Sequence, residues 1–175
     1  MQIVHTKQLK YKKSIIELYL EAFAMGDSEQ YIDIESLNIY IERILKHGIV
    51  LLAIENKKAI GALLACPLSF DNYVTSTITK NFDIDKCVYV AEMMVTESAR
   101  GKGIGKELLN AFFENKQTKH YFDAFIRVWD KNTGAISLYL KMGFEPYTTV
   151  EQTKLKANGS ETFVMQKIYL HKKIN

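Results

Sequence analysis

A buried strand that leads into a basic, glycine-rich turn and an amphipathic helix constrains this chain more than any other feature. The strand, Cys87–Val95, is apolar except for one glutamate, Glu92. The turn reads Arg100-Gly-Lys-Gly-Ile-Gly105, and apolar side chains recur at helical spacing after it. Glycines let a backbone approach a ligand closely, and N–H groups at a helix N-terminus attract anions. The turn therefore predicts a binding site for a phosphate-bearing ligand.

The spacing of the glycines separates this turn from two common phosphate-binding motifs. A P-loop requires Gly-x-x-x-x-Gly-Lys followed by Ser or Thr, and the chain has no such run. A dinucleotide-binding turn requires Gly-x-Gly-x-x-Gly near an N-terminal strand. Here the pattern is Gly-x-Gly-x-Gly past the middle of the chain. A turn that merely joins strand to helix is the structural alternative, and the basic residues Arg100, Lys102 and Lys106 argue against it.

Helical and strand-like segments alternate along the rest of the chain. A capping-box pattern at Ser14–Glu17 opens an expected helix, and Gly26 and Asp27 interrupt the helical pattern that follows. Two more helices are expected at Ile34–Leu45, stopping before Gly48, and at Asn132–Met142. Further strands are expected at Gln2–Thr6, Ile49–Glu55, Ala59–Cys66, Phe122–Val128, Glu145–Thr153 and Thr162–Leu170. The polar segment Asp71–Lys86 lacks a clear period, which indicates a long loop or an irregular insertion.

This order of elements predicts the fold class. Consecutive strands joined by hairpin turns pair antiparallel, and a strand–helix–strand unit adds one parallel crossover. The sequence therefore predicts an α/β (α+β) fold with a mixed, mainly antiparallel sheet of six to seven strands and helices on both faces. A length of 175 residues fits one domain, so residues 1–175 are expected to form a single unit.

Charge, cysteine usage and hydropathy narrow the class of protein. The formal net charge of +3 is too small to require a nucleic-acid partner. Cys66 and Cys87 lie in apolar strands with no Cys or His at metal-ligand spacing, which predicts buried, reduced thiols and no metal site. The first residues lack the apolar core of a signal peptide, and no apolar stretch is long enough to span a membrane. We therefore expect a cytoplasmic protein with no membrane or nucleic-acid partner.

Two linked motifs resemble the signatures of the GNAT superfamily of N-acetyltransferases. The first is Glu92-Met-Met-Val95 followed by Arg100-Gly-Lys-Gly-Ile-Gly105, which meets the superfamily pattern Arg/Gln-x-x-Gly-x-Gly/Ala. The second is Asn132–Phe144, with its Asn, Ala, Leu-Tyr pair and terminal Gly-Phe. Both motifs stand in the superfamily's order and at its usual separation. The resemblance implies a GNAT-like fold that uses acetyl-CoA as cosubstrate without a metal.

The resemblance also implies how individual residues would bind the cofactor. Backbone groups of Met93, Met94 and Val95 would hold the pantetheine arm much as an added strand would. Asn132 would contact the pantetheine or adenosine side. The N–H groups along the turn would hold the pyrophosphate, and these belong to Arg100, Gly101, Lys102, Gly103, Ile104, Gly105 and Lys106. Strands of the superfamily splay apart after the first motif, and this opening would admit the cofactor.

Acetyl transfer also needs an acid that protonates the departing thiolate. Tyr139 matches the tyrosine of the second motif, whose hydroxyl the resemblance directs towards the thioester sulfur. The alternative is a core position, because Ala135, Leu138 and Met142 share its helical stripe. The resemblance favours the role of general acid for Tyr139.

A base must remove a proton from the amine, and Glu92 is the candidate. An ionised carboxylate in a buried strand is costly unless it is paired, solvated or given a raised pKa. Glu92 would lie near the point where the strands separate, and it could act directly or through water. The alternative is a structural glutamate that faces solvent or forms an ion pair with Arg127 or Lys141.

The sequence thus predicts an N-acetyltransferase that moves an acetyl group from acetyl-CoA to a primary amine of a small molecule or peptide in a ternary complex. The alternative is a non-catalytic acyl-CoA-binding sensor or interaction module on the same fold. Acidic residues near the start of the chain would suit a cationic acceptor, or would be ordinary helix-end acids: Glu21, Asp27, Glu29, Asp33 and Glu35. The identity of the acceptor stays open, as does a homodimer formed through the C-terminal hairpin.

Overall fold

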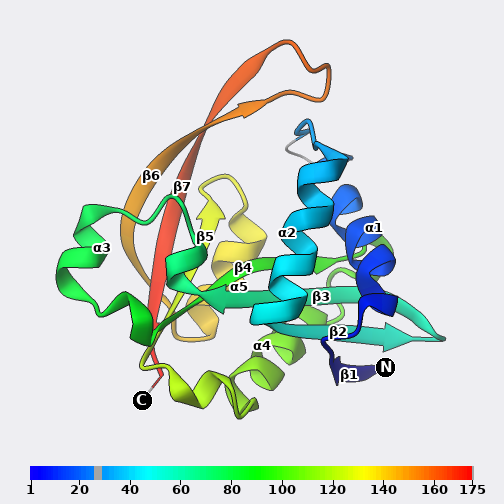
Figure 1. Ribbon diagram of the computed structural model, residues 1–175, viewed down its shortest axis with the longest axis horizontal. Helices are drawn as coiled ribbons and strands as arrows, with labels where there is room; N and C mark the ends of the chain where they lie inside the picture. Colours follow the sequence, from blue (N-terminus) through cyan, green and yellow to red (C-terminus); the bar gives the residue numbers. More distant parts are fainter. Residues whose placement is uncertain (26–28, 175) are drawn as a thin grey trace.

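One mixed sheet runs through the molecule (Figure 1). The computed structural model describes residues 1–25 and 29–174, so the break expected at Gly26 and Asp27 lies outside the described residues. Within them the sheet has the strand order β1-β2-β3-β4-β5-β7-β6. Its strands are β1 (Gln2–His5), β2 (Ile49–Glu55), β3 (Lys58–Pro67), β4 (Cys87–Val95), β5 (Asp123–Trp129), β6 (Glu145–Leu155) and β7 (Thr162–Lys173). Among these described strands only β4 and β5 pair in parallel, which confirms the mixed, mainly antiparallel sheet.

Helices cover both faces of this sheet, as expected. They are α1 (Lys12–Phe23), α2 (Ile34–His47), α3 (Ser76–Asn81), α4 (Ile104–Glu114) and α5 (Thr133–Lys141). Helices α1 and α2 pack on one face, whereas α4 and α5 pack on the other. Helix α3 lies to one side, against the outer part of β5 and β7.

Alternation along β2 produces the two apolar layers. Val50 and Leu52 pack in the same cluster as Ile41 of α2, while Leu51 packs with Leu108 of α4. All five side chains are almost fully buried. Because successive strand residues point to opposite faces, an uninterrupted apolar strand can bury both faces at about 2 kcal/mol for each large side chain. The strand lies between β1 and β3 in the sheet and is covered by helices on both faces.

The first helix begins before the capping-box pattern. A 3-10 turn over Leu9–Tyr11 already places the backbone of Tyr11 in the helical region, and α1 starts at Lys12 without a side-chain cap. Ser14 therefore lies inside the first turn, and the predicted capping box is wrong. A chain that enters from a 3-10 turn has its early N–H groups oriented already and needs no serine at the N-cap.

The segment Asp71–Lys86 is more regular than expected. It contains helix α3, so the expectation of a loop or irregular insertion is wrong for that part. Val74, Ile78 and Phe82 recur every four residues and pack in one apolar cluster with Phe125 of β5. This spacing is the helical signal, and the polar residues between these positions conceal it.

Candidate active site

Strands β4 and β5 lie side by side only over their first residues. Their parallel pairing covers Cys87–Val90 and Asp123–Ile126 and then stops. Ala91 has no partner on β3, so β4 carries a bulge where it leaves β5. Beyond this point β4 continues to Val95 with β3 on one edge and, among the described residues, no strand on the other. Such a free edge presents backbone groups that can bind an extended ligand.

The glycine-rich turn follows this free edge and has a left-handed backbone. Gly101 and Gly103 have φ angles of 75° and 81°, and a Cβ added to either would meet nothing within 4 Å. Conformation rather than space therefore favours glycine at both positions. Gly105 differs, because an added Cβ would lie 2.9 Å from Cδ2 of Leu138 and 3.4 Å from Cε of Met93. Its missing side chain lets α4 lie close to α5 and β4.

Most backbone N–H groups along the turn have no hydrogen-bond acceptor among the described residues. The Arg100 N–H donates to the carbonyl of Glu97, and the first bond of α4 runs from the Glu107 N–H to the carbonyl of Gly103. For the N–H groups of residues 101–106, the described part of the chain offers no acceptor. The side chains of Arg100 and Lys102 are exposed. Unpaired N–H groups at a helix N-terminus, with cations beside them, suit phosphate oxygens.

Helix α5 carries Tyr139, and Asn132 directly precedes the helix. Oδ1 of Asn132 accepts a hydrogen bond of 3.1 Å from the N–H of Ala135 and so caps the helix. Tyr139 is 5% exposed, and its ring meets the ring of Phe144 edge-on. Its hydroxyl makes no hydrogen bond to another described residue. Burial raises the pKa of Tyr139, and the charge of Glu92 raises it further, so the phenol stays protonated at neutral pH.

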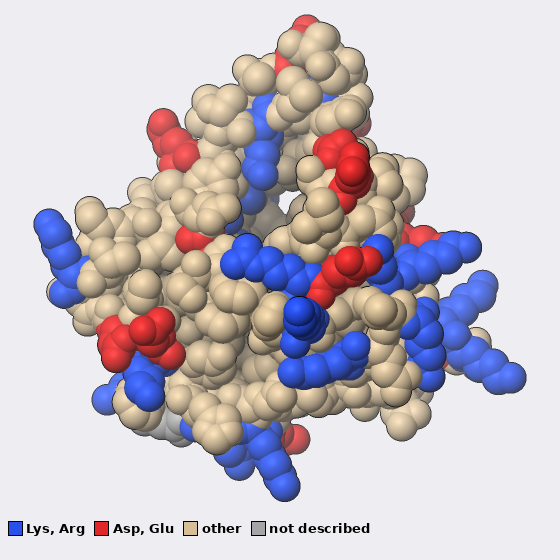
Figure 2. All heavy atoms as spheres, viewed as in Figure 1, with Lys and Arg blue, Asp and Glu red and all other residues tan. Residues whose placement is uncertain are grey.

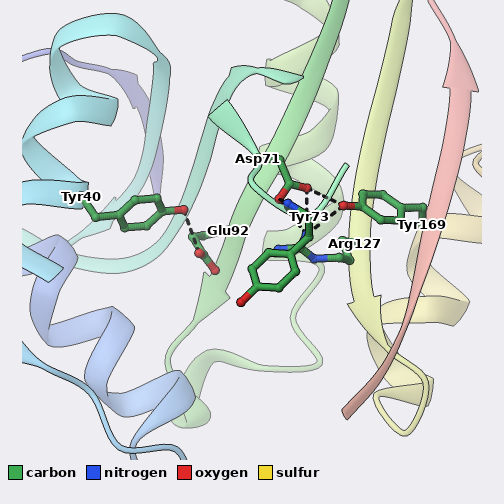
Figure 3. Close-up of polar contacts among 6 residues, drawn as sticks. All are labelled: Tyr40, Asp71, Tyr73, Glu92, Arg127 and Tyr169. Atoms are coloured by element: carbon green, nitrogen blue, oxygen red, sulfur yellow. Dashed lines mark hydrogen bonds and ion pairs between the residues drawn. The ribbon is translucent and has the colours of Figure 1, made fainter. Parts of the chain in front are cut away.

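Glu92 lies where β4 separates from β5, and its carboxylate is held by helix α2. The Tyr40 hydroxyl donates a hydrogen bond of 2.9 Å to Oε1 of Glu92 (Figure 3). Burial raises the pKa of Glu92, while the Tyr40 bond and the charges of Lys167 and Arg127 act in the opposite direction. No ion pair of Glu92 occurs within the described residues, so the alternative partners Arg127 and Lys141 do not hold it.

Arg127 is instead held by Asp71. Its Nη1 lies 2.7 Å and 2.9 Å from the two carboxylate oxygens of Asp71, and the Tyr169 hydroxyl donates to Oδ2 at 2.7 Å. The Tyr73 ring covers the guanidinium, as Figure 3 shows. The Asp71 and Arg127 side chains are only 2% and 10% exposed, so each charge depends on the other. The sequence did not predict this network. The one local signal for it is that Arg127 interrupts a strand of mostly apolar residues, since a buried arginine needs a partner.

A cavity of about 330 Å³ adjoins Glu92 and the Asp71–Arg127 pair. It lies between α2, the segment 70–73 and the strands β4 and β5. Aromatic side chains contribute much of its wall, and these are Tyr19, Tyr31, Tyr40, Phe70, Tyr73 and Tyr89. A cavity of this volume with a few convergent polar groups suits a small-molecule ligand.

A sequence model of the Acetyltransferase (GNAT) family matches residues 12–144. This match covers the separated strands, the glycine-rich turn and Tyr139. The chain belongs to the GNAT acetyltransferase family. Acetyl transfer in this family depends on acetyl-CoA, which agrees with the resemblance of the two motifs.

Solved structures share the fold of this GNAT chain. A ribosomal-protein-alanine N-acetyltransferase from Brucella melitensis has a TM-score of 0.73 and 20% identity, with 99% of each chain covered. An N-acetyltransferase from Staphylococcus aureus Mu50 has a TM-score of 0.73 and 15% identity, with 100% of each chain covered. A Salmonella typhimurium protein solved with its cofactor acetyl-CoA has a TM-score of 0.71 and 17% identity, over 100% of this chain and 95% of that one. These likenesses confirm the predicted fold.

The two GNAT motifs meet in space at Gly105. Met93 of the first motif and Leu138 of the second both lie within 4 Å of the position of an added Cβ there. Glu92 and Tyr139 are close enough for the charge of one to shift the pKa of the other. The two motifs therefore pack against each other, and the individual roles of the predicted cofactor-binding and catalytic residues remain predictions.

Cys66 and Cys87 are free and buried, as expected, and burial raises the pKa of each thiol to about 12. None of the helices in residues 1–25 and 29–174 is long and apolar enough to cross a membrane.

Proposed function

We propose that this GNAT chain is an N-acetyltransferase that transfers an acetyl group from acetyl-CoA directly to a primary amine in a ternary complex. One observation carries the proposal: the free edge of β4 leads into the row of unpartnered N–H groups at the start of α4. An extended pantetheine arm can pair with such an edge, and a pyrophosphate can bind such a row. The opening between β4 and β5 joins this cofactor side to the cavity beside Glu92.

The residues present fit acetyl-CoA at this opening. Met93, Met94 and Val95 form the free edge, and their backbone groups would hold the pantetheine arm. The pyrophosphate would bind the N–H groups from Gly101 to Lys106, whereas Arg100 contributes charge, because its own N–H is already bonded. The Oδ1 atom of Asn132 caps α5, which leaves its amide NH2 to donate to the cofactor. When bound, acetyl-CoA supplies an activated acetyl thioester.

The side chains at the opening have the properties that amine acetylation requires. Glu92 would take a proton from the incoming ammonium, directly or through water, because a carboxylate whose pKa is raised by burial is a better base. The amine nitrogen then bonds to the acetyl carbon as the carbon–sulfur bond breaks. Tyr139 would give its proton to the sulfur and be reprotonated by the proton that the nitrogen releases. The unpartnered hydroxyl of Tyr139 is free to make this contact.

Release of the CoA thiol across a panel of primary amines tests the proposal. Wild-type protein is expected to release thiol only when acetyl-CoA and a suitable amine are both present. Isothermal titration with CoA on the same samples measures binding separately from turnover. Tight CoA binding without thiol release for any amine would instead support a non-catalytic acyl-CoA sensor.

A further inference from the structure

The β6–β7 hairpin closes over the acceptor side of the site, which is the cavity beside Glu92. It extends beyond the sheet and curls towards α1 and α2 (Figure 1). At its tip Lys156 bridges to Gln30, and the Tyr31 N–H donates to the carbonyl of Leu155 at 2.9 Å. Figure 2 shows a gap through the molecule beneath this tip, with basic side chains on one side of it and acidic side chains near the other. The contact between the hairpin tip and residues 30–31 therefore closes the chain into a ring around this gap. A site enclosed in this way suits a small molecule better than a folded protein.

Two lysines of the hairpin share a face of the sheet with Arg127. In the antiparallel register Arg127 lies opposite Tyr169, and Lys167 is two residues from Tyr169 on the same strand. Lys154 lies opposite Phe163, which is four residues from Lys167. Because side chains of a strand alternate and opposite residues share a face, Lys154, Lys167 and Arg127 all lie on one face. This face also carries the cavity beside Glu92.

The charge of Glu92 acts on both lysines, but neither lysine has a carboxylate within ion-pair distance among the described residues. Both lysine side chains are half-buried. Burial lowers the pKa of Lys167 to about 8, with the charges of Lys154 and Arg127 acting in the same direction. Burial also lowers the pKa of Lys154. Asp71 is already bonded to Arg127, so an outside anion would relieve this repulsion.

A buried amide lies on the same face between the lysines. Gln152 is 1% exposed, and neither Oε1 nor Nε2 has a hydrogen-bond partner in the described part of the chain. Gln152 is two residues from Lys154 on β6, so the two side chains share a face. A buried amide without partners is costly, and such groups are commonly retained where a ligand or water meets them.

Two of the acidic residues that would suit a cationic acceptor already accept backbone hydrogen bonds. Asp33 caps α2 by accepting from the Ser36 N–H at 2.8 Å, and Glu21 accepts from the Glu97 N–H at 2.7 Å. Among the groups whose charges act on Lys167, the acids are Glu92 and the paired Asp71. Around Lys167, the charges of Lys154 and Arg127 therefore add to its own, and Glu92 is the acid among these groups that is not bonded to Arg127.

We propose that Lys154 and Lys167 form an anion-binding subsite, and that the acceptor is a small primary amine bearing a carboxylate or phosphoryl group. This inference rests on the proposed acetyl transfer. The amine would lie at Glu92, and the anionic group would lie between the two lysines. Each lysine contributes specificity by binding the acceptor and takes no part in proton transfer.

Matched acceptors test the subsite. Thiol release is measured with α-, β- and γ-amino acids, with aminoalkylphosphonates, and with the carboxamide of each amino acid. Wild-type protein is expected to favour the anionic member of a pair by about tenfold or more in kcat/KM, since a charged hydrogen bond is lost in the amide. The amino acids and the phosphonates distinguish a carboxylate from a phosphoryl group.

Variants show whether the lysines produce this preference. Lys167→Gln and Lys154→Gln are expected to raise KM for the anionic amine by about tenfold. The effect on kcat should be much smaller when the pH is above the rising limb set by Glu92, because the charges of both lysines also lower the pKa of Glu92. Lys167→Arg keeps the charge and is expected to retain the preference. Lys156→Gln is the matched control, because that exposed lysine on the same hairpin pairs with Glu161 and is expected to change nothing.

The outcomes separate this inference from the proposed function. Acetylation of neutral amines in preference to anionic ones, or an unchanged KM in both glutamine variants, would overturn the subsite and leave the acetyltransferase proposal standing. If no amine is turned over, saturation-transfer NMR with CoA and the N-acetylated amino acids still tests the subsite. Binding that is lost in the double glutamine variant supports it, and binding that does not depend on the lysines refutes it.

Discussion

The phenol of Tyr40 donates a hydrogen bond of 2.9 Å to the carboxylate of Glu92, and so joins helix α2 to strand β4 where β4 leaves β5. A hydrogen bond to the ionised form favours it, so this contact offsets part of the rise in the Glu92 pKa that burial causes. Burial thus raises the pKa of the proposed base, while the phenol and the charges of Lys167 and Arg127 lower it. Removing the phenol should therefore change the pKa of Glu92 in a known direction.

Tyr40→Phe is expected to raise the pKa of Glu92, because the carboxylate loses its donor while burial remains. The rising limb of kcat/KM against pH should move to higher pH, with a fall of roughly threefold at a fixed pH on that limb. The amine has the same pKa in both assays, so the shift reports Glu92. Tyr19→Phe is the control, since Tyr19 lines the same cavity and packs against Tyr40 without a bond to Glu92. An unmoved profile in Tyr40→Phe would show that Glu92 is not the base.

Tyr139→Phe is expected to lower turnover by more than roughly tenfold while CoA affinity stays nearly unchanged. Since the hydroxyl bonds to no described residue, its removal should leave the unfolding midpoint in urea almost the same. Steady-state kinetics, isothermal titration and urea denaturation check the three parts. Wild-type turnover in this variant would remove Tyr139 from the role of general acid.

Gly103→Val is expected to abolish CoA binding. Its φ of 81° is strained for a β-branched residue, and the new side chain would enter open space beside the unpartnered N–H groups. Gly159→Val is the matched control, because Gly159 has a φ of 72° but lies at the tip of the β6–β7 hairpin. Titration with CoA should separate the two variants. Equal affinities would show that the turn does not hold the cofactor.

Asp71→Asn is expected to destabilise the protein by about 3 kcal/mol, because it leaves the buried Arg127 guanidinium without its counter-charge. Replacing both residues by apolar ones, Asp71→Leu with Arg127→Met, should cost less than the single change. Urea denaturation measures both. Glu161→Gln removes an exposed ion pair and should have little effect. A single variant as stable as the wild type would mean that the pair is not buried as described.

Lys167 makes stability depend on pH in a defined direction. Its pKa is about 8 in the folded chain against 10.5 as the ordinary value, so between these pH values the unfolded chain binds more protons. Because of Lys167, the free energy of unfolding should therefore increase as the pH rises from 8 to 10.5. Lys167→Gln should stabilise the protein at pH 7, and this advantage should shrink above pH 8. A difference that grows with pH would contradict the lowered pKa.

Local patterns predicted the elements whose signals lie within one short segment. The run from Cys87 to Gly105 predicted a strand, a turn and a helix, since burial and glycine conformation there depend on neighbouring residues. Gly48 was correctly expected to end α2, although its φ of −103° is not left-handed. An added Cβ at Gly48 would lie 2.3 Å from the carbonyl oxygen of Ala65, so close approach to β3 explains this glycine.

The partners of the site could not be predicted, because they come from distant parts of the chain. Tyr40 and Glu92 are 52 residues apart, and Asp71 and Arg127 are 56 apart. Each pair depends on how α2 and the segment before α3 cross the strands, which no local period encodes. The segment containing Asp71 appeared irregular in sequence, yet it supplies the charge that occupies Arg127. This left Glu92 with a phenol rather than an arginine as its partner.

Mass spectrometry of the amine product tests the central proposal most directly. Acetyl-CoA with an isotope-labelled acetyl group is incubated with the protein and the paired panel of amines. We expect the labelled acetyl group on the nitrogen of an anionic amine, and we expect Glu92→Gln combined with Tyr139→Phe to prevent this while CoA still binds. Tight binding of acetyl-CoA by the wild-type protein with no label on any amine would contradict it.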